Sequence, residues 1–276
     1  MKTGICTFPT AATIRPSDLA LEAEGRGLDS VWFAEHSHIP VERTSVWGGG
    51  PVLPDFYYEA LDPVVAITDA AAATSTIELG FGVALLIQRD IIQFAKSLAS
   101  VAALAGPRIH VGVGGGWLIE EMQNHGTDPT TRFRRLRESV EALRTLLSDD
   151  EPEYHGRIID FDPVHLLPKP NAVPPIHVGG AAPRGLERAI RYGDGWIPLT
   201  GRGDADMTAL AEERDRAQQA AGRSIEMTIY AAPVDAATWA EFRSAGVDRV
   251  LPLVVPSDRD TTRRQLDEIA ALTNSE

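Results

Sequence analysis

The chain has 276 residues and a formal net charge of −13, from 26 Lys and Arg against 39 Asp and Glu, and its length suits one α/β barrel domain over residues 1–276. A single cysteine, Cys6, excludes a disulfide framework and a cysteine-based metal cage, and the acidic balance without basic runs argues against nucleic acid as a partner. The longest apolar stretch, residues 79–87, is far shorter than the ~20 residues that span a bilayer, so we expect a cytoplasmic protein that does not contact a membrane.

Short apolar runs alternate with amphipathic segments along the whole chain. The runs that predict strands are residues 4–8, 30–34, 78–84, 109–114, 175–179, 195–199, 226–231 and 249–255. The segments that predict helices begin near residues 17, 62, 90, 131, 183, 204, 235 and 258. Eight strand–helix units are typical of a (β/α)8 TIM-like barrel, and a doubly wound sheet is the alternative.

Two insertions interrupt this alternation. Residues 37–61 follow the second predicted strand and are rich in Gly, Pro and aromatic residues. They are too long for an ordinary strand–helix loop, which indicates a functional or mobile segment and a candidate substrate lid. Residues 149–174 precede the fifth predicted strand and hold five prolines. We expect this segment to leave the barrel and return to it at that strand.

Glycines alternate with branched residues in three of the predicted strands. In residues 109–114 this alternation leaves Gly114 on the barrel side, at the carboxyl end of the strand. By the same parity Gly82 and Gly179 face the interior, whereas Val83 faces the helices. The missing side chains predict room for a flat, bulky ligand; a role in turns and helix packing alone is the alternative.

A glycine pair also marks the start of the helix expected after the fifth strand. Gly179 and Gly180 end the strand, and Pro183 stands near the helix start. Free backbone N–H groups at such a helix terminus suit a phosphate group, and Arg184 adds positive charge. This arrangement predicts a local anion site in an acidic protein; a plain turn is the alternative.

Histidines follow the second predicted strand. His36 stands where a barrel enzyme places a proton donor or acceptor, because active sites lie at the carboxyl ends of barrel strands. His36 and His38 also suggest a metal-dependent hydrolase, but the first and sixth strands offer no further ligand. Phe8 lies at the exit of the first strand and lines a pocket or packs in the core. The other polar candidates are interpreted as hydrogen-bonded core residues or as a solvated helix face: His110, His177, Arg132, Arg134, Arg135 and Arg137.

Four segments together resemble the bacterial luciferase-like superfamily of flavin- and deazaflavin-dependent oxidoreductases. They are residues 27–40, 78–104, 107–126 and 174–198, in the order in which the family has them. The sequences of these segments are most similar to the actinobacterial branch that uses the 8-hydroxy-5-deazaflavin coenzyme F420 rather than FMN. The resemblance implies hydride transfer between this cofactor and a small organic substrate, in a homodimer; an FMN-dependent monooxygenase is the alternative.

The resemblance also implies positions for the cofactor in the barrel mouth. It places His36 beside the ring as the catalytic residue, a cis peptide between Gly82 and Val83 behind the ring, and the phosphate on Gly179 and Gly180. The implied cofactor-binding residues are Phe8, His36, Gly82, Val83, Gly114, Gly115, Gly179, Gly180 and Ala181, and no metal is implied.

The sequence departs from the sugar-phosphate dehydrogenases of this family at two positions. Trp117 stands where they have a catalytic glutamate, and Pro40 stands where they have a tryptophan. Their substrate and their general acid are therefore not carried over to this chain. The missing glutamate also leaves a binding protein without catalysis as an alternative.

Overall fold

Parallel strands close into a barrel in the computed structural model of the chain, which describes residues 1–199 and 206–273. The barrel strands are β1 (Lys2–Thr7), β2 (Ser30–Phe33), β3 (Glu78–Ala84), β4 (Ile109–Val113), β7 (Ile176–Gly179), β8 (Gly195–Ile197), β9 (Glu226–Ala232) and β10 (Arg249–Pro252). Their order around the barrel is β1-β10-β9-β8-β7-β4-β3-β2. Each lies within or overlaps one of the eight predicted runs, so the predicted (β/α)8 barrel is confirmed.

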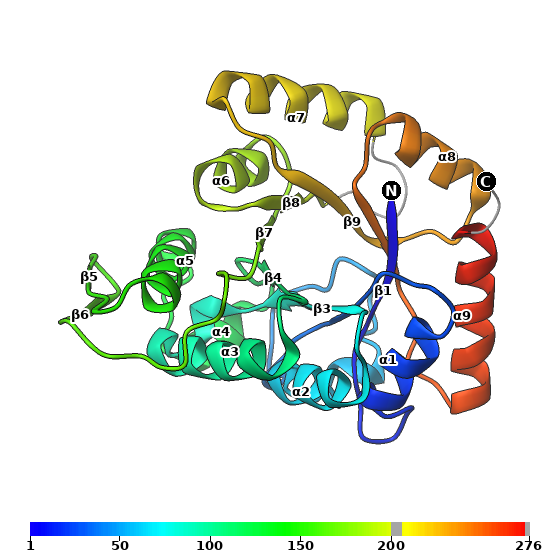
Figure 1. Cartoon of the computed structure of the whole chain (residues 1–276), viewed down its shortest axis with the longest axis horizontal. Helices are drawn as coiled ribbons and strands as arrows, with labels where there is room; N and C mark the ends of the chain where they lie inside the picture. Colours follow the sequence, from blue (N-terminus) through cyan, green and yellow to red (C-terminus); the bar gives the residue numbers. More distant parts are fainter. Residues whose placement is uncertain (200–205, 274–276) are drawn as a thin grey trace.

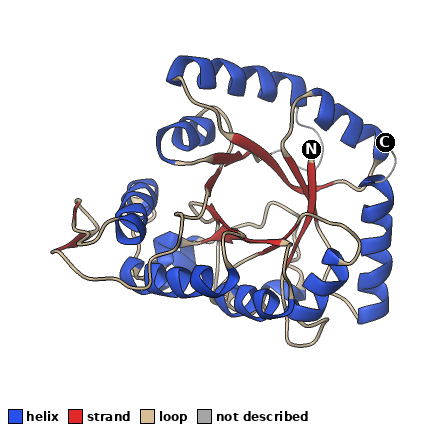
Figure 2. Cartoon of the chain, in the orientation of Figure 1, coloured by secondary structure: helices blue, strands red, loops and turns tan. Residues whose placement is uncertain are grey.

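Helices surround the strands on the outside of the barrel (Figures 1 and 2). The longer ones are α1 (Pro16–Glu24), α2 (Pro63–Ala73), α3 (Ile91–Ala105), α5 (Arg132–Ser148), α6 (Arg184–Tyr192), α7 (Met207–Ala221), α8 (Ala236–Ser244) and α9 (Arg259–Thr273). Shorter ones lie in the loops: η1 (Asp55–Tyr57), η2 (Leu86–Gln88) and α4 (Ile119–Asn124). No helix in residues 1–199 and 206–273 is long and apolar enough to cross a membrane.

Aspartate side chains begin several of these helices. Asp62 Oδ1 accepts a hydrogen bond from the backbone N–H of Val64 at 2.8 Å, and Asp90 caps α3 in the same way. The first helix differs from the prediction: it begins at Pro16, one residue before the expected cap, because proline suits the first helical position. The helix expected near residue 204 is α7, capped by Asp206, and residue 204 itself lies outside the described part of the chain.

Trp32 fills the deep interior of the barrel. Its side chain is fully buried and clusters there with Cys6, which is also fully buried. A Cβ atom at Gly80 would lie 2.3 Å from the Trp32 ring, and one at Gly112 would lie 3.1 Å from it. These two glycines therefore make room for an indole of the protein itself.

The parity prediction is wrong for Val83. The peptide bond between Gly82 and Val83 is cis, as the family resemblance implied, and the register between β3 and β4 shifts between Phe81 and Ala84. The Val83 side chain consequently packs with the interior cluster rather than against the helices. A Cβ atom at Gly114 would lie 2.9 Å from Val83 Cγ2, so this glycine accommodates the valine.

Two segments extend from the barrel. The chain between β2 and α2 carries η1 and returns to the exit of β1, where Ala60 forms a bridge with Thr10. The chain between α5 and β7 carries an antiparallel hairpin of β5 (Tyr154–His155) and β6 (Asp160–Phe161). In Figure 1 this hairpin projects on the left, beside α5.

Candidate active site at the carboxyl end of the barrel

His36 is the centre of a buried polar cluster at the carboxyl end of β2. The residue is only 9% exposed, and Nδ1 of its ring lies 2.8 Å from Glu121 Oε2. On the other side of the ring, Trp117 Nε1 donates a hydrogen bond to Nε2 at 3.3 Å. Both ring nitrogens of the predicted catalytic residue therefore have fixed partners.

Glu121 is the residue that sequence reasoning missed. It lies on α4, is 1% exposed, and its Oε1 accepts hydrogen bonds from the backbone N–H of Ser37 at 2.8 Å and from the Ser37 hydroxyl at 3.1 Å. Glu121 follows four positions after Trp117, the residue that the family resemblance aligns with a catalytic glutamate of the sugar-phosphate dehydrogenases. The only sequence signal was a carboxylate one turn beyond the substituted position, and nothing in the sequence shows that α4 folds back onto the second strand.

These contacts fix the tautomer of His36. The indole N–H of Trp117 is only a donor, so Nε2 of His36 must be the acceptor, and the ring proton therefore sits on Nδ1 and faces Glu121. Burial disfavours the ionised Glu121 carboxyl, but the contacts with His36 and the hydrogen bonds from Ser37 outweigh it and lower the pKa below the ordinary 4.5. An ionised carboxylate thus orients a neutral imidazole whose lone pair points away from it, on Nε2.

Aromatic side chains enclose the other faces of the His36 ring. Phe8 is parallel to it to within 8°, with the ring centres 6.4 Å apart. Tyr57 of η1 lies 5.3 Å from His36 and 4.3 Å from Phe8, between ring centres. The segment of residues 37–61 therefore reaches the mouth of the barrel through Tyr57, and Phe8 lies beside both Tyr57 and His36 there.

Glu35 is a second buried carboxyl beside the site. Its Oε2 accepts the backbone N–H of Leu85 at 2.9 Å, and its Oε1 accepts Nε of Arg89 at 2.8 Å. Arg89 also reaches Asp62 at 2.7 Å. Burial raises the pKa of Glu35, and the charge of Arg89 opposes that rise. The network ties the end of β2 to the chain that follows β3, and so holds the two strand ends that flank His36.

The glycines after β7 form an open cradle. A Cβ atom at Gly179 would meet no atom closer than 3.3 Å, and Gly180 has a φ of +153°, which a side chain rarely allows. The backbone N–H groups of Ala181 and Ala182 donate to no described residue. Arg188 Nη1 would lie 3.5 Å from a Cβ at Gly180. The arrangement offers free N–H donors and a guanidinium beside a helix start, which suits an anion.

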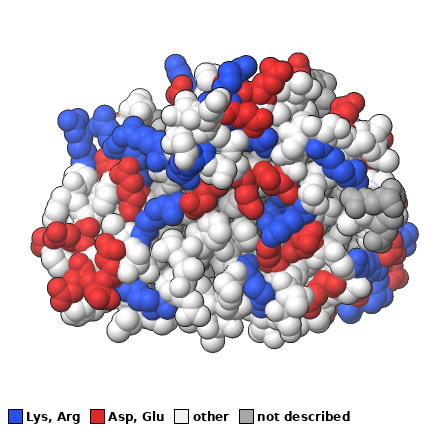
Figure 3. Space-filling view, turned by 45° about the horizontal axis from the view of Figure 1, so that its top comes forward, with Lys and Arg blue, Asp and Glu red and all other residues white. Residues whose placement is uncertain are grey.

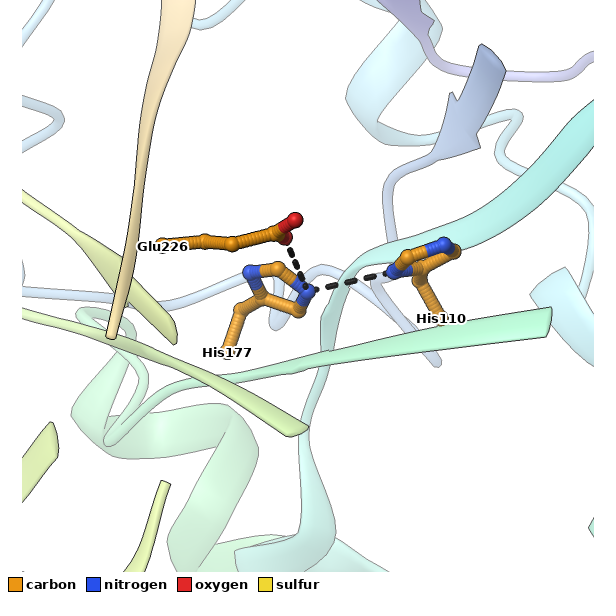
Figure 4. Close-up of side chains that lie close together, drawn as sticks. All are labelled: His110, His177 and Glu226. Atoms are coloured by element: carbon orange, nitrogen blue, oxygen red, sulfur yellow. Dashed lines mark hydrogen bonds and ion pairs between the residues drawn. The ribbon is translucent and has the colours of Figure 1, made fainter. Parts of the chain in front are cut away.

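A cluster of potential metal ligands among the described residues lies at the end of the barrel opposite His36. Ligand atoms of His110, His177 and Glu226 all lie within 4.8 Å of one another (Figure 4). These residues stand at the beginnings of β4, β7 and β9, whereas His36 follows the end of β2. The three side chains contact one another directly: His110 Nδ1 lies 3.2 Å from His177 Nε2, which lies 3.5 Å from Glu226 Oε2. The cluster is the floor of the barrel and does not contribute to the mouth.

An arginine occupies the same floor. Arg249 is 1% exposed, and its Nη2 lies 2.7 Å from Glu78 Oε2, which in turn lies 3.3 Å from His110 Nε2. Burial lowers the pKa of His177 well below 6.5, and the positive charge of Arg249 lowers it further. The cluster therefore holds one fixed cation of the protein, and the interpretation of His110 and His177 as hydrogen-bonded core residues agrees with these contacts.

Comparison with known families and proteins agrees with this geometry. The family described as luciferase-like monooxygenase matches residues 9–271. The uncharacterized protein Rv0953c of Mycobacterium tuberculosis is 34% identical over 281 residues, which cover 98% of each chain. The F420-dependent glucose-6-phosphate dehydrogenase of Kineococcus radiotolerans is 30% identical over 220 residues, which cover 77% of this chain and 61% of that protein. Among solved structures, monooxygenase RslO1 from Streptomyces bottropensis superposes with a TM-score of 0.80 at 20% identity, over 98% of each chain.

Proposed function

Because the chain belongs to the luciferase-like monooxygenase family, we propose that it is a coenzyme F420-dependent oxidoreductase that moves a hydride between the deazaflavin and a small organic substrate. The F420-dependent relative from Kineococcus radiotolerans supports this choice of cofactor. Its sugar-phosphate substrate is not extended to this chain, because Trp117 and Pro40 replace the residues that the sugar-phosphate dehydrogenases carry.

The observation that carries the proposal is the Glu121–His36 pair at the barrel mouth. A buried carboxylate 2.8 Å from Nδ1 holds the imidazole in one tautomer and stabilises a positive charge on it. Nε2 is then the atom that accepts or returns a proton, and in the absence of substrate it is satisfied by Trp117. Such a pair supports acid–base work more than a purely binding role.

The residues at the mouth fit a flat, anionic cofactor. Val83 and Phe8 offer apolar contact for a ring system, and Gly114 and Gly115 allow the Val83 and Phe133 side chains to pack closely at the proposed cofactor position. We propose that Gly82 supports the ring, that Gly179 and Gly180 let the phosphate approach the backbone closely, and that the backbone N–H of Ala181 binds it, because the Gly180 N–H already donates to the Ile197 carbonyl. Burial of the polar atoms around His36 excludes water from the proton-transfer atom.

The chemistry is divided between the cofactor and the chain. When bound, the deazaflavin supplies a carbon that accepts or donates a hydride. In place of the Trp117 N–H, a substrate hydroxyl would donate a hydrogen bond to His36 Nε2, which takes up its proton. In the reverse direction, the protonated Nε2 would donate to the substrate carbonyl oxygen and return the proton. Glu121 keeps Nε2 free for this task because its charge retains the other proton on Nδ1.

Cofactor titration is the first test. The purified protein is titrated with oxidised and reduced F420 and, separately, with FMN, with fluorescence as the readout. We expect F420 to bind, and the absence of F420 binding would overturn the proposal. Binding of FMN with flavin-dependent oxygen consumption would support the FMN-dependent monooxygenase instead.

The second test concerns His36. His36→Gln is expected to lower the rate of deazaflavin reduction by small alcohols about 10²- to 10⁴-fold, the usual contribution of a positioned acid or base. The affinity for the cofactor should stay within about threefold of the wild type. His165→Gln, on an exposed loop, is the matched control. An unchanged rate in His36→Gln would remove His36 from the mechanism.

A further inference from the structure

A cleft of about 780 Å³ lies between α5, α6 and the β5–β6 hairpin, beside the mouth but outside the His36 cluster. In Figure 3, Lys and Arg side chains gather on the upper left of the visible face, above acidic ones. The cationic side chains that line the cleft are Arg134, Arg137, Arg157, Arg188 and Arg191. In a chain with a net charge of −13, such a concentration of arginine is a local reversal of the global charge.

Most of these arginines have no anionic partner in the part of the chain that the structure describes. Arg137 lies 3.5 Å from Glu138 and 3.9 Å from Glu141. The other four make no ion pair and donate no side-chain hydrogen bond to any residue in the ranges 1–199 and 206–273. A cleft lined by charges of one sign raises the local concentration of counter-ions, so these arginines favour an anion in the cleft.

The buried carboxylate in the cleft is already used. Glu138 is 2% exposed, and its Oε2 accepts the backbone N–H groups of Ile158 at 2.7 Å and Ile159 at 3.1 Å. Burial alone would raise the pKa of Glu138. The backbone N–H groups of Arg157, Ile158 and Ile159 outweigh burial and lower that pKa. Glu138 therefore fixes the hairpin to α5 and does not satisfy the arginines opposite.

Tyr192 supplies an independent sign of a ligand. The residue is 7% exposed and lines the cleft, but its hydroxyl makes no hydrogen bond with the described residues. Burial raises the pKa of Tyr192 to about 12, so the hydroxyl is a donor at neutral pH. A buried donor without an acceptor is unfavourable, and an anion in the cleft would satisfy it.

The cleft is continuous with the proposed cofactor cradle. Arg188 stacks on Phe133, with 3.7 Å between the guanidinium carbon and the ring centre. The same Arg188 approaches Gly180, and Phe133 approaches Gly115, where a Cβ atom would lie 2.5 Å from the Phe133 ring. Two residues of the cleft wall thus contact the glycines at the mouth. Stacking also holds the guanidinium in a fixed orientation.

We propose that this cleft, which we call the arginine cleft, binds an extended ligand with several anionic groups, such as a chain of carboxylates or phosphates. Arginine matches both groups through paired N–H donors, and the Tyr192 hydroxyl adds a neutral donor. The ligand is either the anionic tail of an F420 molecule seated in the barrel mouth or a separate small polyanion. Only the first of these sources rests on the proposed function.

Two probes test the cleft directly on the full chain without cofactor. Tripolyphosphate and a γ-linked tetraglutamate are titrated by calorimetry at about 50 mM and about 200 mM NaCl, because screening weakens such contacts. We expect binding that weakens with salt, and at least a tenfold loss of affinity in Arg134→Gln/Arg191→Gln. Tyr192→Phe, which removes only the hydroxyl, should weaken binding severalfold.

A charge-matched control separates the cleft from general electrostatics. Arg216→Gln/Arg264→Gln removes the same two charges from α7 and α9, far in sequence from the cleft. It should retain wild-type affinity for both probes. Equal loss in both double variants, or no binding of either probe to the wild type at low salt, would overturn the proposal.

Cofactor competition distinguishes the two sources of the ligand. If the tail of F420 occupies the arginine cleft, F420 with its tail blocks tetraglutamate binding and the deazaflavin without a tail does not. If the ligand is a separate polyanion, tetraglutamate and F420 bind together; both results support a polyanion site. If F420 does not bind at all, the proposed function is wrong. The titrations with tripolyphosphate and tetraglutamate still show whether the arginine cleft binds polyanions.

Discussion

Glu121 and His36 lie 85 positions apart in the sequence, yet their Oε2 and Nδ1 atoms are 2.8 Å apart and both residues are buried. The pair joins α4 to the loop after β2, so that a carboxylate controls the proton position on the proposed catalytic imidazole. The first prediction follows from this contact.

Glu121→Gln is expected to lower the turnover number about 10²-fold while leaving the cofactor affinity unchanged. If the amide oxygen keeps the Ser37 donors, the amide NH₂ group faces Nδ1 of His36 and favours the proton on Nε2 instead. Steady-state kinetics and cofactor titration measure the two quantities. Glu241→Gln, on the exposed side of α8, is the control. A loss of cofactor affinity equal to the loss of turnover would show that Glu121 has only a structural role.

Gly114→Ala should lower the free energy of unfolding by about 1–3 kcal/mol, the usual cost of overpacking a core. The new methyl group would lie 2.9 Å from Val83 Cγ2. Adding Val83→Ala should restore part of the loss, because it removes the atoms that collide. Urea denaturation of the two single variants and the double variant measures this coupling. Strict additivity of the two substitutions would show that Val83 does not occupy the space above Gly114.

Glu24 should contribute to the acid sensitivity of the fold. Burial opposes its charge, but the N–H groups of residues 75–77, which point at Oε1, lower the pKa from 4.5 to about 2. A depressed carboxyl pKa gives stability that is complete above pH 4.5 and is lost as the pH falls toward 2. Because the side chain is partly exposed and its charge is screened by solvent, the contribution is discounted to about 1 kcal/mol.

Glu24→Gln is therefore expected to destabilise the protein at neutral pH and to flatten the pH dependence of the urea midpoint below pH 4.5. Glu268→Gln, on the exposed face of α9, should leave that dependence unchanged. A parallel pH dependence in Glu24→Gln and the wild type would contradict the assignment.

The barrel floor is expected to hold no stoichiometric metal. The Arg249 guanidinium already neutralises the Glu78 carboxylate beside His110, and a divalent cation would add charge next to it. Treatment with EDTA should change neither activity nor the free energy of unfolding. Elemental analysis that finds about one zinc per chain, and loses it in His177→Gln, would make the floor a structural metal site.

The barrel itself could be predicted from the sequence because its signal is local. Each strand is a short apolar run between turn residues. Asp62 and Asp90 are N-cap residues, which indicate where their helices begin. The interior could not be predicted by parity alone. A register shift in β3 moves Val83 to the barrel side, and no periodic pattern in the sequence records such a shift.

The candidate site divides in the same way. His36 could be found from its place after a strand, which is a local feature. Glu121 and the arginine cleft could not, because each depends on how two distant segments approach one another. The arginines on α5 have the composition of a solvated helix face until α6 and the hairpin are placed opposite them.

Cys6 has a practical value that comes from its burial. Inaccessibility raises the pKa of its thiol to about 12, so the reactive thiolate is absent near neutral pH. We therefore expect maleimide reagents not to label the native chain near neutral pH. A cysteine introduced at Val46, which is 81% exposed, would carry a fluorophore alone, so that movement of residues 37–61 during turnover could be followed without replacing the native thiol.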